Sequence, residues 1–224
     1  MSTSSAPPSP GGSGAFTLAA WNIRCGRNAG LTSAAKGLAQ MGVGLAVVTE
    51  TKITDAHYPR LASGYKILAS RAASHNQGGI ALLWKEKHQF FEVEAATVVT
   101  PNLMTFQLVT GYERFYVMGT YIPPNDMTGV DALRTAWAAC PADCTPLVMG
   151  DLNINFEHPW NAREEDIADL LDEINLVDSS RKFHLRRCRL QSAKKRWTWR
   201  QKQMGRWHHS QPDYILAREG DIRY

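Results

Sequence analysis

The sequence predicts a single α/β domain, a sandwich in which sheets of largely antiparallel strands pack with a few helices. Many short apolar segments alternate with only three helical stretches. Three successive strands are joined by links centred on Pro101-Asn102 and Gly111, which are too short for a helical crossover and favour hairpins. No G-x-G-x-x-G motif or P-loop follows any strand, which disfavours a doubly wound nucleotide-binding fold.

The domain is expected to span residues 15–224, since residues 1–14 form a Ser/Pro/Gly tail that lacks the apolar surface needed to fold. Helices are predicted at 31–41, 130–139 and 163–174, the last opening with acidic residues that suit the helix dipole. Strands are predicted, in order, at 16–23, 44–50, 65–70, 78–84, 90–99, 103–110, 114–122, 145–150, 196–200 and 212–217.

Composition excludes several classes of protein. The 224 residues are 44% hydrophobic and 21% charged, which is typical of a globular chain that needs no disulfides. The N-terminus does not read as a signal peptide, and no apolar run approaches the roughly 20 residues of a membrane span. The four cysteines lack zinc-ribbon or CxxC spacing. We therefore expect an intracellular protein, nuclear or cytoplasmic, that is neither secreted nor membrane-bound.

Positive charge is concentrated in one segment. The chain has a net charge of +4, but residues 181–206 contain 11 Lys and Arg and no acidic residue, so the remainder carries −7. An acidic body with one strongly basic segment indicates a polyanionic partner, although a solvated loop is the alternative. Trp197, Trp199 and Trp207 interleave with the basic residues and could stack on or wedge between bases. The alternation in RWTWR, however, favours a core position for one of Trp197 and Trp199.

Compact polar groups follow three apolar strands, with Asn22, Glu50 and Asp151-Leu152-Asn153 each placed where a strand ends. Each residue alone has an ordinary structural explanation. Glu50 could begin a surface loop, and Asn22 or Asp151 could cap a turn through its own backbone. A rigid strand that ends in a polar residue nevertheless holds that side chain with little freedom, which suits a functional site.

Two further residues join this set. Tyr121 lies at the end of another strand and Asp213 at the start of one. Taken alone, Tyr121 is better explained as a core aromatic whose hydroxyl finds a backbone partner, and Asp213 could be a buried charge paired with an arginine. Together the candidates supply carboxylates and amides for Mg²⁺, which takes only one or two protein carboxylates, and donors for phosphate oxygens. This set favours metal-assisted phosphodiester hydrolysis, in which a carboxylate deprotonates a water molecule.

The motifs WNI, VVTETK, GGIALLW, GTYIPPN, GDLN, RWTW and PDYIL, in this order, resemble the exonuclease–endonuclease–phosphatase superfamily, which includes DNase I, apurinic endonucleases, inositol phosphatases and sphingomyelinases. The resemblance extends from about Phe16 to Ala217. TETKIT, GGIALLW and the TW…PDYIL ending are most similar to the apurinic-endonuclease-like domains of LINE-type non-LTR retrotransposons. The resemblance implies a DNase I-like four-layer αββα sandwich of two mostly antiparallel mixed sheets, with the site at one end.

The resemblance also implies roles for individual residues. Glu50 corresponds to the metal-ligand glutamate, with Asn22 as its neighbour, and the cofactor is Mg²⁺, with Mn²⁺ as an alternative. Tyr121 corresponds to the tyrosine that contacts the scissile phosphate, and Asp151 to the aspartate that aligns or activates the water. Asn153 corresponds to the asparagine that stabilises the pentacovalent state, and Asp213 to the aspartate that orients a catalytic histidine.

One feature departs from the family pattern. The family ends with a further strand and a Ser-Asp-His motif that supplies the histidine, whereas the sequence stops at Tyr224 without it. We expect the last strand to be absent and the activity to be impaired, since losing such an acid/base group costs around 10²–10⁴-fold in rate. His208 and His209 are expected in a Ser/Gln-flanked turn and are not expected to replace it. A fragment, a truncated gene or a decayed element would each explain the ending.

The resemblance places a loop or hairpin that reaches the substrate in the basic segment, and we predict that it binds double-stranded DNA through Arg186, Arg187, Arg189, Lys194, Lys195, Arg196, Arg200, Lys202 and Arg206. The predicted function is a Mg²⁺-dependent DNA endonuclease that nicks target DNA, with element RNA and a reverse transcriptase domain as further partners. The alternatives are an inactive nucleic-acid-binding remnant and a phosphatase or phosphodiesterase of the same superfamily. Cys140 and Cys144 are interpreted as a helix end, His158 as a surface turn and Arg134 as a solvated charge.

Overall fold

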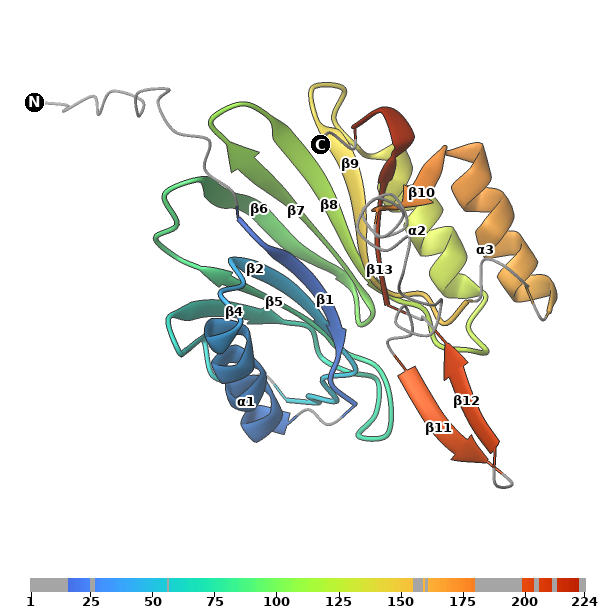
Figure 1. The fold of residues 1–224 in the computed structure, drawn as a ribbon, viewed down its shortest axis with the longest axis horizontal. Helices are drawn as coiled ribbons and strands as arrows, with labels where there is room; N and C mark the ends of the chain where they lie inside the picture. Colours follow the sequence, from blue (N-terminus) through green and yellow to red (C-terminus); the bar gives the residue numbers. More distant parts are fainter. Residues whose placement is uncertain are drawn as a thin grey trace, which may run out of the picture.

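The structure is a computed structural model that describes residues 16–24, 27–55, 57–154, 159, 161–179, 199–203, 206–210 and 213–221. The predicted tail at 1–14, His158 and most of the basic segment lie outside these residues. Within these ranges, two large β-sheets and three α-helices make up the body of the fold (Figure 1). No helix in the described part of the chain is long and apolar enough to cross a membrane.

The first sheet has five strands in the order β1-β2-β5-β4-β3. β1 and β2 are parallel and are connected through helix α1, while the other pairs are antiparallel. The bounds are β1 Leu18–Asn22, α1 Arg27–Gln40, β2 Leu45–Thr49, β3 Leu61–Ala62, β4 Tyr65–Ala69 and β5 Ile80–Lys85.

The second sheet has six strands in the order β10-β13-β9-β8-β7-β6. Only β8 and β9 are parallel, and helix α2 connects them. The bounds are β6 Phe91–Thr100, β7 Leu103–Thr110, β8 Arg114–Tyr121, α2 Thr128–Ala138, β9 Thr145–Asp151, α3 Ala162–Glu173, β10 Leu176–Asp178 and β13 Asp213–Arg218. A separate hairpin consists of β11 Trp199–Gln203 and β12 Arg206–Ser210, and a 3₁₀ turn, η2, spans Glu219–Asp221.

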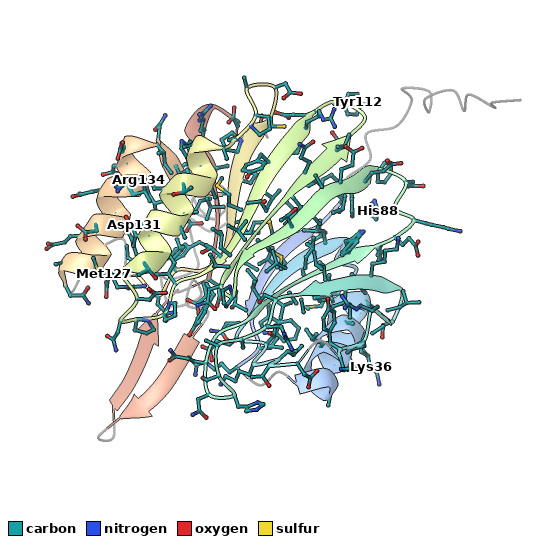
Figure 2. The ribbon with its side chains drawn as sticks, turned by 180° about the vertical axis from the view of Figure 1, so that it is seen from behind. Lys36, His88, Tyr112, Met127, Asp131 and Arg134 are labelled. Atoms are coloured by element: carbon teal, nitrogen blue, oxygen red, sulfur yellow. The ribbon has the colours of Figure 1, made fainter. Side chains whose placement is uncertain are left out.

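Three apolar clusters separate four layers. In order, the layers are helix α1, the five-stranded sheet, the six-stranded sheet, and helices α2 and α3 together. The fully buried strand β2 shows how: Leu45 and Val47 pack against the other sheet, while Ala46 and Val48 pack against α1. The third cluster lies between the six-stranded sheet and helices α2 and α3, which cover its outer face (Figures 1 and 2). Strands buried on both faces explain the continuous apolar runs in the sequence, and the predicted α/β sandwich is confirmed.

The differences from the predicted elements are local. β3 and β10 were not predicted, because two or three residues carry no readable periodicity. β12 was also not predicted, so the expectation that His208 and His209 lie in a turn is wrong; they pair with Gln201 and Arg200 of β11. Helix α1 starts at Arg27 rather than at residue 31, since its first turn is polar and carries no apolar signal.

All the strands that carry candidate site residues meet at one end of the sandwich. β1, β2, β8 and β9 end there, whereas β13, which is antiparallel to β9, begins there. Gly150 enables the close approach of β9 to β8 at this end: its φ is +142°, and a Cβ atom would collide with the backbone carbonyl of Thr120. Glycine tolerates this conformation, and the next residue, Asp151, is thereby directed into the rim.

Candidate active site

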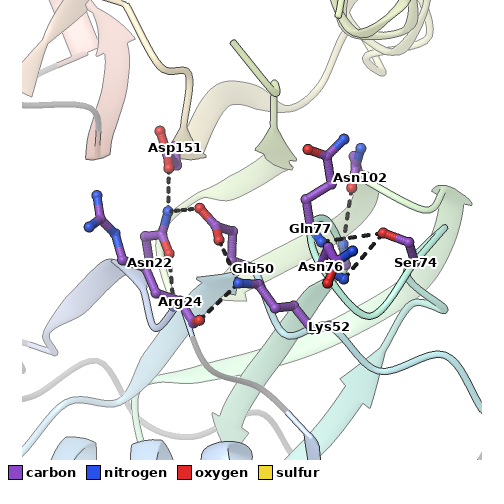
Figure 3. Close-up of polar contacts among 10 residues, drawn as sticks. Asn22, Arg24, Glu50, Lys52, Ser74, Asn76, Gln77, Asn102 and Asp151 are labelled. Atoms are coloured by element: carbon purple, nitrogen blue, oxygen red, sulfur yellow. Dashed lines mark hydrogen bonds and ion pairs between the residues drawn. The ribbon is translucent and has the colours of Figure 1, made fainter. Parts of the chain in front are cut away.

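Asn22, at the end of β1, links the two sheets through its side chain. Its Nδ2 donates to Glu50 Oε1 at 2.9 Å and to Asp151 Oδ2 at 2.5 Å (Figure 3). Its backbone N–H donates to Asp213 Oδ1 at 3.1 Å. Glu50 follows β2 in one sheet, and Asp151 and Asp213 belong to β9 and β13 in the other. Residues up to 191 positions apart in the chain therefore contact one another.

Glu50 is partly exposed between two fully buried threonines, so its carboxylate is fixed at the base but open at the tip. Lys52 Nζ lies 3.3 Å from Glu50 Oε2 and also donates to the carbonyl of Arg24 at 3.0 Å (Figure 3). One oxygen of the Glu50 carboxylate thus accepts from the Asn22 amide, and the other lies beside the Lys52 ammonium. Glu50 is therefore more than a surface residue that begins a loop.

The backbone around the site is unusual. Arg24, Glu50, Lys52 and Asn153 all have positive φ, between 47° and 54°, although none is glycine. Non-glycine residues adopt this region only when their surroundings hold them there, and such residues cluster at functional sites. The backbone N–H groups of Thr51 and Lys52 donate to the carbonyls of Gly79 and Gly78, which fixes the loop that carries Glu50.

Asp151 is buried, with 1% of its surface exposed, and it lies directly opposite Asp213 in the antiparallel β9–β13 pair. Burial raises the pKa of Asp151 to about 7, and the negative charges of Asp213 and Glu50 contribute to the rise, while hydrogen bonds from Asn22 and the backbone N–H of Asn153 oppose it. Like charges placed opposite each other destabilise a sheet, so this arrangement costs stability in the folded protein.

Tyr121, the last residue of β8, is buried beside the same carboxylates. Burial, the charges of Glu50 and Asp151, and a side-chain hydrogen bond with Glu50 all raise the pKa of the Tyr121 hydroxyl. The hydroxyl therefore stays protonated throughout the physiological pH range and can act as a hydrogen-bond donor at the site.

Asn153 lies two residues after Asp151, and its backbone N–H donates to Asp151 Oδ1 at 2.9 Å. Its side-chain Nδ2 donates to the carbonyl of Ile122 at 3.1 Å, which leaves the second hydrogen of that amide to donate elsewhere. The predicted Asx turn is therefore present in this segment, and it fixes the orientation of the Asp151 carboxylate.

The donor set is compatible with a divalent cation of the Mg²⁺ type. Within the described ranges there is no group of three or more His, Cys, Asp or Glu that could hold a metal ion. Mg²⁺, however, is held by one or two carboxylates with water molecules completing its shell. Glu50 supplies one such carboxylate, although a cation there would compete with the Lys52 ammonium. The Nδ2 of Asn22 faces the carboxylates, whereas its amide oxygen accepts from the N–H of Arg24 at 3.0 Å and has a second lone pair that a cation could use.

The structure thus brings together Asn22, Glu50, Tyr121, Asp151, Asn153 and Asp213. The predicted DNA contacts divide differently: Arg200, Lys202 and Arg206 lie on the hairpin strands, whereas Arg186, Arg187, Arg189, Lys194, Lys195 and Arg196 lie outside the described residues. Cys140 follows the end of α2, and Arg134 projects from α2 with 54% of its side chain exposed, both as predicted (Figure 2).

Two residues at the site were not predicted from the sequence. In the sequence, Lys52 stands out only as one member of the polar group that follows β2. Arg163 marks the expected opening of an amphipathic helix, yet its guanidinium is buried and donates to three backbone carbonyls near Asp151. A basic residue in the first turn of a helix, where acidic residues are favoured, was the available signal.

Two facing mixed sheets covered by helices, with carboxylates and amides gathered at one end, define the DNase I-like class of α/β sandwich. The sequence matches the endonuclease/exonuclease/phosphatase family over residues 19–224, nearly the whole chain, and the protein belongs to this family. The superfamily resemblance seen in the motifs is confirmed. No curated protein matches the chain.

Solved structures with the same fold are distant in sequence. The endonuclease domain of TRAS1, a telomere-specific non-LTR retrotransposon, is 16% identical with a TM-score of 0.63, over 92% of this chain and 86% of that one. An AP endonuclease from Archaeoglobus fulgidus is 16% identical, with a TM-score of 0.62 over 91% and 86%. The 3′ phosphatase NExo from Neisseria, bound to a product DNA hairpin, is 16% identical, with a TM-score of 0.61 over 93% and 88%.

Proposed function

We propose that the protein is a metal-dependent endonuclease that hydrolyses a phosphodiester bond of double-stranded DNA and leaves a nick. The observation that carries this proposal is the side chain of Asn22, which donates to Glu50 and Asp151 at once and so joins strand ends of both sheets into one polar site. Two carboxylates, two amides and a protonated phenol are the groups that phosphodiester hydrolysis requires.

Each residue then has a defined task. Glu50 and Asn22 would hold Mg²⁺ or Mn²⁺, and the bound ion would supply positive charge to the phosphate. The Tyr121 hydroxyl donates a hydrogen bond to a non-bridging phosphate oxygen, where negative charge accumulates in the transition state. Asn153 donates the second hydrogen of its amide to the same group. The Asp151 carboxylate, aligned by Asn22 and by the backbone N–H of Asn153, orients the attacking water and accepts its proton.

Asp213 has a supporting task in this scheme. It accepts a hydrogen bond from the backbone N–H of Asn22 and lies beside Asp151 in the sheet. In the family, the corresponding aspartate is expected to orient a histidine that protonates the leaving group. In this scheme the leaving oxygen takes its proton from solvent.

The basic segment supports DNA as the substrate. Residues 181–206 carry 11 Lys and Arg and no acid, while the rest of the chain is acidic. The β11–β12 hairpin begins within this segment and is followed in the chain by β13, whose first residue is Asp213. Figure 1 shows the hairpin extending beyond the end of the sandwich at which β13 begins. Cations along a projecting hairpin can neutralise several phosphates on either side of the scissile bond.

We further propose that the nick serves retrotransposition of the non-LTR type, in which it would prime reverse transcription on element RNA by a reverse transcriptase domain. The motifs TETKIT and PDYIL and the fold shared with the TRAS1 endonuclease domain support this assignment. Removal of a terminal phosphate from DNA is the second candidate, supported by the fold shared with the 3′ phosphatase NExo.

Relaxation of supercoiled plasmid DNA in Mg²⁺ tests the proposal. We expect conversion to the nicked form, loss of nicking in EDTA, and loss of nicking in the Asp151→Asn variant. Parallel reactions contain a 3′-phosphorylated duplex, a phosphoinositide and sphingomyelin. Salt-dependent DNA binding without nicking would establish the inactive binding protein instead, and hydrolysis of one of the other substrates without nicking would assign the protein to that chemistry.

A further inference from the structure

Arg163 occupies a position that elementary electrostatics disfavours. It is the second residue of helix α3, where the helix dipole presents its positive end, and only 5% of its surface is exposed. Glu164 and Glu165, which follow it, are the residues expected there. A buried cation at this position requires strong compensating contacts, and local rules of this kind are broken mostly at functional sites.

The hydrogen bonds of the guanidinium are made by its two Nη groups and reach backbone carbonyls next to the candidate site, while its Nε is buried without a hydrogen-bond partner among the residues that the structure describes. Nη1 donates to the carbonyl of Asn153 at 3.1 Å, and Nη2 donates to the carbonyls of Ile122 at 3.0 Å and Leu152 at 2.8 Å. Ile122 directly follows Tyr121 at the end of β8, while Leu152 and Asn153 directly follow Asp151 at the end of β9. One side chain therefore spans the two segments that leave the parallel strand pair.

These segments lie beyond the regular strand ladder. The N–H of Ile122 still donates to the carbonyl of Asp151 at 2.9 Å, and the side chain of Asn153 donates to the carbonyl of Ile122. Asn153 has a φ of +47°, a conformation that persists only when surrounding groups determine it. The bond from Arg163 to the Asn153 carbonyl holds the next peptide plane, so it fixes this conformation from outside the turn.

We propose that Arg163 is a positioning residue, which holds Asn153 and Tyr121 at the correct distance from Asp151 by binding the backbone of both segments. It does not touch the substrate, because its two Nη groups are directed at carbonyls and it is buried. The catalytic consequence rests on the proposed function, whereas the effect on the two segments does not. The competing explanation is that Arg163 simply stabilises the start of α3.

Two variants and two controls distinguish these explanations. Arg163→Met removes the donors with little change in length, and Arg163→Lys retains the charge but not the forked geometry. Asn161→Ala removes the N-cap of α3, since Asn161 Oδ1 accepts from the N–H of Glu164 at 3.0 Å, but leaves the guanidinium in place. Arg134→Ala removes an exposed arginine of α2 whose ion pairs are 3.9 and 4.0 Å long.

The first measurement is amide hydrogen exchange by NMR, which needs no activity. Loss of hydrogen bonds from a charged donor is expected to speed exchange at Ile122 and Asn153 by about tenfold or more in both Arg163 variants. Amides of the buried strands β2 and β5 are expected to keep their wild-type rates, and neither control should change Ile122 or Asn153. If Arg163→Met does not fold, Arg163→Lys alone gives the comparison.

The second measurement is the nicking rate at saturating DNA, with the DNA dissociation constant measured separately. Misplacement of catalytic groups is expected to lower the rate by roughly 10²-fold while leaving DNA affinity within about twofold. Unchanged exchange at Ile122 and Asn153, exchange that rises equally throughout the protein, or the same effect in Asn161→Ala would overturn the proposal. If the wild-type protein does not nick DNA, the proposed function fails, but the exchange data still decide the role of Arg163.

Discussion

Replacing Asp151 by asparagine is expected to make metal-free protein more stable at neutral pH and less stable in acid. In the folded protein, burial and the nearby charge of Asp213 raise the pKa of Asp151 to about 7 from 3.8. The folded state therefore binds this proton more tightly than the unfolded chain does. Ionisation of Asp151 reduces stability progressively as pH rises from about 4 to about 7, and the loss is complete above that range.

The magnitude follows from the size of this shift. About three pKa units at 1.4 kcal/mol each give an upper limit of roughly 4 kcal/mol for the destabilisation at pH 8. Asparagine has one acceptor oxygen, whereas Asp151 accepts from both Asn22 and the N–H of Asn153, so the variant loses about 1–3 kcal/mol at every pH. The variant is thus expected to be less stable than wild type by about 1–3 kcal/mol near pH 4 and more stable by a similar amount near pH 8.

The assay is urea unfolding in EDTA at several pH values between 4 and 8, followed by circular dichroism. Asp169→Asn, which replaces a carboxylate of α3, serves as the control for the removal of one acidic group. A constant difference for Asp151→Asn across the same range would refute the reasoning, since it would mean that Asp151 titrates normally in the folded protein.

Three other outcomes are expected. Glu50→Gln should lower Mg²⁺-dependent nicking by at least about 10²-fold while retaining DNA binding in a mobility-shift assay, and Glu173→Gln on the exposed face of α3 should change neither. Gly150→Ala should lower the free energy of unfolding by more than about 1 kcal/mol, because its Cβ would collide with a carbonyl of β8; Gly111→Ala, which has open space, is the control. The logarithm of the DNA affinity should fall linearly with the logarithm of the salt concentration. Alanine substitutions at residues 194–196 should reduce the steepness of that line by about 0.9 for each phosphate that these side chains neutralise. An unchanged slope would exclude these three residues from DNA binding.

Much of the fold could be predicted because central strands such as β2 and β5 are buried on both faces. Runs such as LAVVT and IALLW contain almost no polar residue to break them, and the turns between β6, β7 and β8 are short enough to require hairpins. β3 and β10 could not be predicted, since their pairing depends on neighbours already in the sheet rather than on their own two or three residues.

The sequence also indicated which residues gather at the candidate site, because a polar residue directly after a buried strand is held at the end of the sheet. The detailed geometry of the site could not be predicted. No local signal indicates a left-handed conformation for Glu50 or Lys52; tertiary contacts with Gly78 and Gly79 impose it. The contacts of Arg163 could not be predicted either, because its hydrogen bonds reach carbonyls 10 and 41 residues away, whereas the sequence of the helix indicated only an opening with acidic residues.

The shared position of Asn22, Glu50 and Asp151 around one divalent cation is tested most directly by paramagnetic broadening with Mn²⁺. Substoichiometric Mn²⁺ is expected to broaden the side-chain NH₂ signals of Asn22 and the backbone amides at 50–52 and 151–153, and to spare those of α2. Competition with excess Mg²⁺ should restore the signals. Broadening confined to other surfaces, or none at these positions, would contradict the assignment of the site.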